Sequence, residues 1–148
     1  MRLAQKTIGP ELLQATTQLE MKIRAAGLDN GLLHLVKVRA SQINGCAYCL
    51  DLHSKEARAD GESETRLYMV GVWREAPGFT AKERAALAWT ETVTRIADTH
   101  VPDAEWDAVR QEFSEAEVAK LTVAIGMVNF WNRLAVSFRS IPGSRPGS

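Results

Sequence analysis

The sequence lacks an excess of charge, a long apolar run and any cysteine beyond two. Its 148 residues carry 18 basic and 18 acidic side chains, so the basic surplus typical of proteins that bind nucleic acid or anionic membranes is missing. The most apolar stretch, Leu121 to Asn132, is uncharged for only 12 residues, whereas a membrane-spanning helix needs about 20. Neither nucleic acid nor a membrane is therefore an expected partner.

The N-terminal segment, Met1 to Thr7, has no apolar core of signal-peptide length. We therefore expect a cytoplasmic protein. In that compartment an isolated Cys-x-x-Cys pair is more often redox-active or metal-binding than a structural disulfide.

The chain shows no sustained alternation of apolar and polar residues with β-branched enrichment, which is the pattern of strands. The apolar spacing is helical nearly throughout, and it predicts an all-α bundle of about six or seven helices with no sheet. A length of 148 residues and 45% hydrophobic content suit one domain with its own core. We expect that domain over residues 1–140, and a disordered tail over 141–148 because that segment is rich in Pro, Gly and Ser.

Start and stop signals predict where the helices lie. Capping boxes at Thr80–Glu83 and Ser114–Glu117 mark two helix starts. Proline, glycine and further capping residues set the other boundaries. The expected helices cover residues 10–26, 30–43, 46–60, 64–70, 81–96, a stretch from 103 and 115–138.

The last predicted helix, residues 115–138, is apolar on almost every face. A small bundle would leave part of such a surface exposed, so burial in a subunit interface explains the pattern. A central helix surrounded by its own chain is the alternative. We expect a homo-oligomer.

The two cysteines, Cys46 and Cys49, stand at the start of a predicted helix, and His53 follows one turn later. Unpaired backbone N–H groups and the helix dipole favour a thiolate in a first turn. The spacing puts all three side chains on one helical face, so His53 can act on Cys49 as a base. Such a dithiol can reduce a peroxide through a sulfenic acid and a disulfide, or exchange disulfides with a partner.

Other uses of these residues stay open at this point. The cysteines could be buried packing residues. With His34 from the preceding helix, Cys46, Cys49 and His53 would make a Cys₂His₂ set for zinc, although the spacing differs from that of zinc fingers. Thioredoxin-like chemistry is a further option, but no βαβ pattern supports that fold.

Residues 32–55, LLHLVKVRASQINGCAYCLDLHSK, strongly resemble the core of the AhpD-like alkylhydroperoxidases of the carboxymuconolactone decarboxylase superfamily. Asn129 to Arg133, Trp89 and the turn Val101–Asp103 extend the resemblance over about residues 10–140. It implies an all-α homo-oligomer, often a dimer, trimer or hexamer. It also implies thiol peroxidase or disulfide reductase activity, with a hydroperoxide as substrate and a thiol or disulfide reductant as partner. No metal or other cofactor is expected.

Matched to this family, the catalytic residues are Cys46, Cys49 and His53, with Cys49 reacting with peroxide and Cys46 resolving and exchanging with the reductant. Cys46 is also expected to be the better exposed thiol. The family's relay glutamate falls at His34, which is kept as a catalytic candidate because a histidine can shuttle protons near neutral pH. A second histidine of the best-known branch is Tyr48 here. Glu56, three residues after His53, could orient the imidazole in place of the missing glutamate, although a solvated surface acid is the expected state of such a residue.

These departures keep a second function open, a redox sensor or interaction module whose dithiol switches assembly with little turnover. The decarboxylase branch of the superfamily typically lacks the cysteine pair, which argues against that activity. Outside the motif, His100 is expected at the surface. Asn129, Asn132 and Arg133 are expected either to make subunit hydrogen bonds or to shape the mouth of the site.

Overall fold

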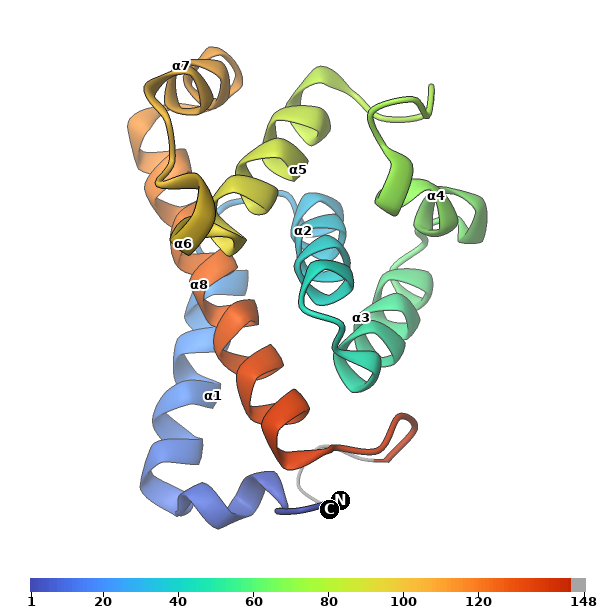
Figure 1. Ribbon diagram of the computed structural model, residues 1–148, viewed down its shortest axis with the longest axis vertical. Coiled ribbons are helices and arrows are strands. Elements are labelled where there is room, and N and C mark those ends of the chain that lie inside the picture. Colours follow the sequence, from blue (N-terminus) through green and yellow to red (C-terminus); the bar gives the residue numbers. More distant parts are fainter. Residues whose placement is uncertain (145–148) are drawn as a thin grey trace.

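Helix α2 (Asn30–Ile43) lies at the centre of the computed structural model, which describes residues 1–144 (Figure 1). Nine of its 14 residues are buried, and it contacts α3 (Ala47–Ala59), α5 (Ala81–Thr94) and α8 (Glu115–Phe138). The remaining elements are η1 (Gln5–Ile8), α1 (Pro10–Arg24), α4 (Glu64–Met69), η2 (Val70–Val72), α6 (Ile96–Thr99) and α7 (Asp103–Glu112).

The all-α prediction is confirmed, because the described residues form eight α-helices and two 3-10 helices and contain no strand. The helix count exceeds the expected six or seven by one. The additional helix is α6, since the predicted helix over 81–96 stops at Thr94 and Arg95 leaves helical geometry at φ −99° and ψ 32°. Local capping signals did not reveal this interruption.

The expected N-caps are present in the structure. Thr80 and Ser114 each accept a hydrogen bond from the backbone N–H of the glutamate three residues later, and that glutamate bonds back to the cap. Asp29 caps α2 by accepting from Leu32 N. These bonds satisfy backbone donors that a helix start leaves unpaired, and they define where α2, α5 and α8 begin.

Helix α8 is covered mainly by its own chain. Its buried side chains, among them Val118, Leu121 and Ile125, join the main core with residues of α2 and α5. Val123 and Val136 on its outer face are 50% and 39% exposed. The homo-oligomer stays a prediction, with only part of the α8 surface left for a partner.

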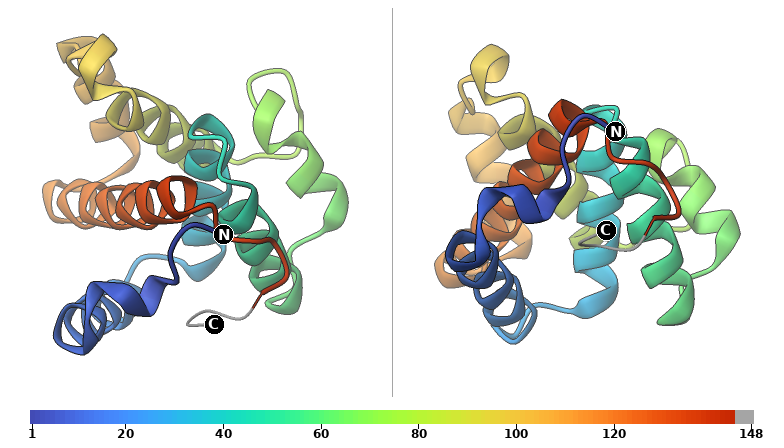
Figure 2. Two further views of the ribbon diagram at one scale, coloured as in Figure 1. Left: turned by 60° about the horizontal axis from the view of Figure 1, so that its bottom comes forward. Right: turned by 90° about the horizontal axis from the view of Figure 1, so that it is seen from below.

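Helix α1 packs more loosely than the other long helices. Ile23 is its single buried residue, whereas Leu12 and Met21 are more than 60% exposed. It runs beside α8, as the two views of Figure 2 show. An ion pair between Glu20 of α1 and Lys37 of α2 ties it to the centre of the fold.

The N-terminal end of the described chain bonds to α8, and its C-terminal end bonds to α3. Arg2 N donates to Phe138 O at 2.6 Å, and residues after Ser140 turn back so that Gly143 N donates to Asp51 Oδ2 at 3.0 Å. Of the predicted disordered tail, residues 145–148 lie outside the described residues. No helix within residues 1–144 is long and apolar enough to cross a membrane.

Candidate functional site

Cys46 and Cys49 are joined by a disulfide at the start of α3, with 5.3 Å between their Cα atoms. Cys46 is the N-cap residue, and its Sγ accepts a hydrogen bond of 3.2 Å from Cys49 N. The expectation that Cys46 is the better exposed thiol is wrong, because both residues are 2% exposed. The turn that buries Cys46 also buries its partner against Ala135 of α8.

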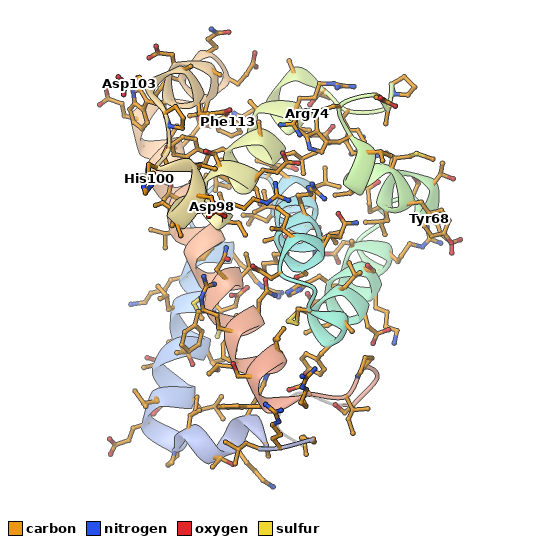
Figure 3. The ribbon with its side chains drawn as sticks, in the orientation of Figure 1. Tyr68, Arg74, Asp98, His100, Asp103 and Phe113 are labelled. Carbon is orange, nitrogen blue, oxygen red and sulfur yellow. A yellow bond between two sulfur atoms is a disulfide. The ribbon has the colours of Figure 1, made fainter. Side chains whose placement is uncertain are left out.

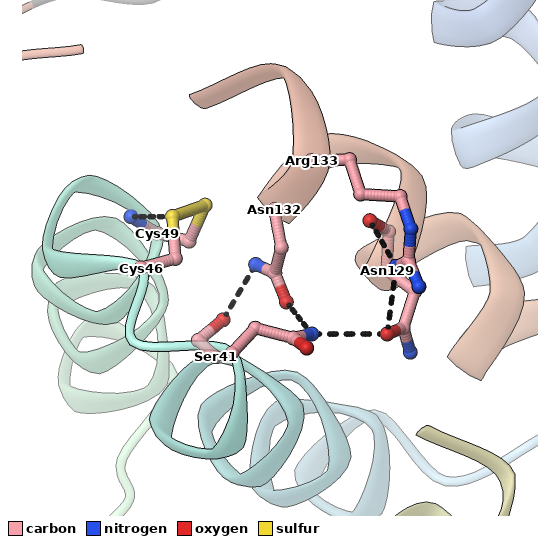
Figure 4. The surroundings of a disulfide bond; sticks show 7 residues. Ser41, Cys46, Cys49, Asn129, Asn132 and Arg133 are labelled. Atoms are coloured by element: carbon pink, nitrogen blue, oxygen red, sulfur yellow. Dashed lines mark hydrogen bonds between the residues drawn. A yellow bond between two sulfur atoms is a disulfide. The ribbon is translucent and has the colours of Figure 1, made fainter. Parts of the chain in front are cut away.

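A buried polar network holds the turn that precedes Cys46 (Figure 4). Asn44 Nδ2 donates to Asn129 Oδ1 at 2.9 Å and to Asn132 Oδ1 at 2.8 Å. Asn132 Nδ2 in turn donates to Ser41 Oγ at 3.1 Å. These bonds lie within one chain, so α8 fixes the end of α2 and thereby the start of α3. Asn129 and Asn132 thus support the cysteine turn from inside the same subunit, and Arg133 bonds to Asn129 at 3.1 Å. None of the three lines the cavity beside Cys49, and hydrogen bonds between subunits stay a prediction.

A cavity of about 310 Å³ opens beside Cys49 and His53. One wall comes from α1, another from α3, and Trp131 of α8 contributes to the lining. The lining residues are Gln5, Leu13, Thr17, Glu20, Arg24, Tyr48, Cys49, Leu52, His53, Glu56 and Trp131. Apolar side chains with a few convergent polar groups are typical of small-molecule sites.

Within this cavity His53 is hydrogen-bonded to Glu56, with 3.1 Å between Nδ1 and Oε2. A carboxylate only accepts, so Nδ1 carries the donated proton and Nε2 is left for other partners. The hydrogen bond from His53 is the main cause that lowers the pKa of Glu56 to about 2. Glu56 is therefore an anion over the physiological pH range.

Two further charged groups line the cavity from α1. Glu20 pairs with Lys37, whose side chain is only 6% exposed. Arg24 lies 3.5 Å from both Glu20 and Glu56. Burial by itself raises the pKa of Glu20, but the bond to Lys37 and nearby positive charge outweigh it and lower the value. The result is a chain of alternating charges that reaches His53.

Sequence reasoning missed Glu20, Arg24 and Lys37 as residues of this region. The only signal was Lys37 itself, a charged residue inside the apolar run of residues 32–40. A buried lysine requires a partner of opposite charge, but nothing in the sequence around Lys37 indicates that this partner comes from α1. The contact joins residues that lie 17 positions apart in the sequence.

The structure does not bring His34 to this cavity. Its Nε2 donates to Asp60 Oδ2 at 2.6 Å, at the opposite end of α3 from the cysteines. The Nδ1 atom is buried and has no hydrogen-bond partner among residues 1–144. His34 thus lies where it holds the last turn of α3 to α2.

His100 also lies apart from the cysteines, at the end of α6 near the top of the molecule (Figure 3). It is exposed, as expected from the sequence. Over residues 1–144 no three His, Cys, Asp or Glu side chains are grouped in a way that would hold a metal ion.

A disulfide at the first turn of a helix, with a histidine one turn later inside an all-α bundle, is the arrangement expected of an AhpD-like protein. The model of the carboxymuconolactone decarboxylase family matches residues 10–92, and the chain belongs to this family. The disulfide between Cys46 and Cys49 supports a redox role for the site.

Two other proteins are similar to this chain over nearly its whole length. The chain is 32% identical over 144 residues to the uncharacterized protein YdfG of Bacillus subtilis (strain 168), covering 97% of this chain and 98% of YdfG. A crystal structure from Agrobacterium tumefaciens is 46% identical, with a TM-score of 0.92 and coverage of 97% of this chain and 99% of that one. That protein has no known function and carries a suggested assignment as the antioxidant defence protein AhpD.

The debrominase Bmp8 shares the fold at 21% identity, with a TM-score of 0.80 over 93% of this chain and 74% of that chain. At this identity the likeness concerns the fold alone.

Proposed function

We propose that the protein is a dithiol-dependent hydroperoxide reductase. The observation that carries the proposal is the Cys46–Cys49 disulfide, of which Cys49 lines a cavity together with the bonded pair His53 and Glu56. A thiol that reacts with peroxide needs an accessible approach, a proton acceptor and a resolving thiol. Cys49, His53 and Cys46 fill these three roles.

In the first step the reduced Cys49 transfers its proton to His53 Nε2, and the thiolate attacks the terminal peroxide oxygen. The O–O bond breaks, Cys49 becomes a sulfenic acid, and the departing alkoxide takes the proton back from His53. Glu56 holds the imidazole through Nδ1 and compensates its transient positive charge. The peroxide is reduced to an alcohol by two electrons from sulfur.

In the second step Cys46 attacks the sulfur of the Cys49 sulfenic acid. The S–S bond forms, and the hydroxyl group leaves with the thiol proton as water. The Cα separation of 5.3 Å allows this bond without moving the helix. An external dithiol then returns the site to its reduced form, and the cytoplasm, which supplies such thiols, is the compartment proposed.

The cavity favours an organic hydroperoxide of modest size. Its volume of about 310 Å³ is near the lower end for small-molecule pockets. Leu13, Leu52 and Trp131 offer apolar surface for an alkyl or aryl group. Glu20 and Glu56 line the cavity together with Arg24, so its charged groups are of both signs.

Peroxide turnover with dithiothreitol as reductant tests the proposal. The wild type is expected to turn over, whereas Cys46→Ser and Cys49→Ser are expected to lose catalysis. Without dithiothreitol, Cys46→Ser should still consume about one equivalent of peroxide, because Cys49 can be oxidised without being resolved. Equal rates for the three proteins would contradict the proposal. A protein that changed its oligomer size on oxidation without consuming peroxide would instead be a redox sensor.

We also propose that the protein forms a homo-oligomer through α1 and α8. Leu12 and Leu19 lie two turns apart on α1, and both are more than 40% exposed. Leu19 and Val123 line a shallow apolar hollow between the two helices. Light scattering should give a mass above 16.3 kDa for the wild type and a lower mass for Leu19→Glu. A monomeric wild type would refute this part of the proposal.

A further inference from the structure

The two sulfur-bearing residues of the disulfide open onto different hollows. Cys49 lines the cavity of about 310 Å³ that contains His53 and Glu56. Cys46 lines a separate hollow of about 100 Å³, formed with Ala135, Val136 and Arg139 at the end of α8. Tyr48 contributes to both. A thiolate that attacks a disulfide bonds to one sulfur and expels the other, so the accessible sulfur decides which thiol leaves.

The surroundings of Cys46 suit a departing thiolate. Its Sγ already accepts a hydrogen bond from Cys49 N at 3.2 Å, and it caps the N-terminus of the 13-residue helix α3. Backbone N–H groups and the helix dipole stabilise negative charge at that position. A better-stabilised thiolate is the better leaving group in thiol–disulfide exchange.

We propose that the reductant enters by the main cavity and attacks Cys49, and that Cys46 is expelled as a thiolate stabilised by the start of α3. This inference rests on the proposed function and deepens it, because peroxide and reductant then use one entrance in turn. It reverses the role that the family resemblance implies for Cys46 in the reductive step. Cys46 still resolves the sulfenic acid in the oxidative step.

Reduction of the disulfide takes two exchange steps. One thiolate of the reductant bonds to Cys49 Sγ, the Cys46–Cys49 bond breaks, and Cys46 Sγ takes the electron pair and then a proton. The second thiol of the reductant loses its proton and attacks its own first sulfur. Cys49 leaves as a thiolate and is protonated in turn. The reductant departs as an intramolecular disulfide, and both cysteines are reduced.

The geometry also selects the kind of reductant. Cys49 is 2% exposed and is approached through a cavity, so a dithiol on a flat protein surface cannot contact its sulfur. A slender dithiol such as dithiothreitol can.

Two variants that narrow the two entrances separately provide the test. Thr17→Trp places a large ring at the exposed α1 rim of the main cavity, and Ser140→Trp does the same at the hollow beside Cys46. The rate constant for reduction of the oxidised protein by dithiothreitol should fall about tenfold or more in Thr17→Trp and stay within about twofold in Ser140→Trp. The opposite order, or equal slowing in both, would overturn the proposal.

Chemical trapping gives a second readout on the unaltered protein. Oxidised wild type is treated with excess 2-mercaptoethanol and quenched with N-ethylmaleimide, and tandem mass spectrometry locates each group. Mercaptoethanol on Cys49 with maleimide on Cys46 is expected, and the reverse arrangement contradicts the inference. Neither experiment contains peroxide. A protein without peroxidase activity would contradict the proposed function, but the two experiments would still show which cysteine the reductant attacks.

A comparison of dithiothreitol with a protein dithiol tests which kind of reductant reaches Cys49. Dithiothreitol should reduce the wild-type disulfide faster than reduced thioredoxin does at the same thiol concentration. Faster reduction by the protein dithiol, with no slowing in Thr17→Trp, would show that the main cavity is not the route.

Discussion

The imidazole of His53 is bound to Glu56 three residues further along α3, with 3.1 Å between Nδ1 and Oε2. This carboxylate lies on the histidine's own helix, whereas the family resemblance implies a glutamate on the preceding helix, at the position of His34. The bond defines which ring nitrogen is protonated, and it leaves Nε2 for other partners.

Glu56→Gln should slow the reaction with peroxide while leaving the fold intact. The amide keeps the size of the side chain but loses the negative charge that compensates a protonated His53. We expect kcat/KM for an organic hydroperoxide to fall about tenfold, and the free energy of unfolding to change by less than about 1 kcal/mol because Glu56 is partly exposed. Glu75→Gln, at an exposed glutamate outside the cavity, is the matched control and should behave as wild type.

Rescue distinguishes a positioning role from a structural one. Glu56→Asp retains the charge on a shorter side chain and should recover part of the activity lost in Glu56→Gln. If both variants have wild-type kcat/KM, the bond between His53 and Glu56 has no part in turnover.

Much of the fold was predictable because its signals are local. Capping residues such as Asp29, Thr80 and Ser114 bond to N–H groups three residues away, so the sequence itself contains both partners. The bond between His53 and Glu56 is of the same kind, and its spacing allowed it to be foreseen. A short interruption such as Arg95 carries no glycine or proline to announce it.

Contacts between distant segments could not be predicted in the same way. Glu20 and Lys37 form an ion pair although they lie on different helices, 17 residues apart in the sequence. His34 occupies the family's glutamate position, yet its side chain points to Asp60. The direction of a side chain at a matched position depends on the partners around it, which a linear motif does not contain.

Removing Glu20 should destabilise the protein through Lys37. Lys37 is 5% exposed, so Glu20→Gln leaves a buried ammonium group without its counter-ion, at a cost of about 3 kcal/mol. The double variant Glu20→Gln with Lys37→Met removes both charges and should regain much of that loss. Urea unfolding of the wild type, Glu20→Gln, Lys37→Met and the double variant measures the coupling, and strictly additive effects would show that the pair is not coupled.

Acid should weaken the fold through Glu91. Its carboxylate accepts hydrogen bonds from Trp73, Arg39 and Arg74 at 2.6 to 2.9 Å. Burial alone raises the pKa of Glu91, but these hydrogen bonds and positive charges outweigh it and lower the pKa below the ordinary 4.5. Since the folded value is below the unfolded one, the stabilisation is complete above about pH 4.5 and is lost as the pH falls further.

Glu91→Gln reports that contribution directly. At pH 7 the variant should be less stable than wild type by about 3 kcal/mol, because two arginines lose their buried counter-charge. The difference should shrink as the pH falls below 4.5, where the wild-type carboxylate begins to be protonated. Unfolding by urea at pH 7, 5 and 3 checks this, and a difference that grew at low pH would contradict the assignment.

Placing a glutamate at position 34 should fail to restore the family's arrangement. The side chain at this position faces Asp60 near the end of α3, so His34→Glu would set two carboxylates against each other and leave the cavity at Cys49 unchanged. We expect a loss of stability of about 1 to 2 kcal/mol and no gain in kcat/KM for hydroperoxide. Adding Asp60→Asn removes the repulsion and should recover the stability without altering the rate. A rise in peroxidase activity in His34→Glu would instead show that a carboxylate at position 34 can reach His53, and that Glu56 is not its sole possible partner.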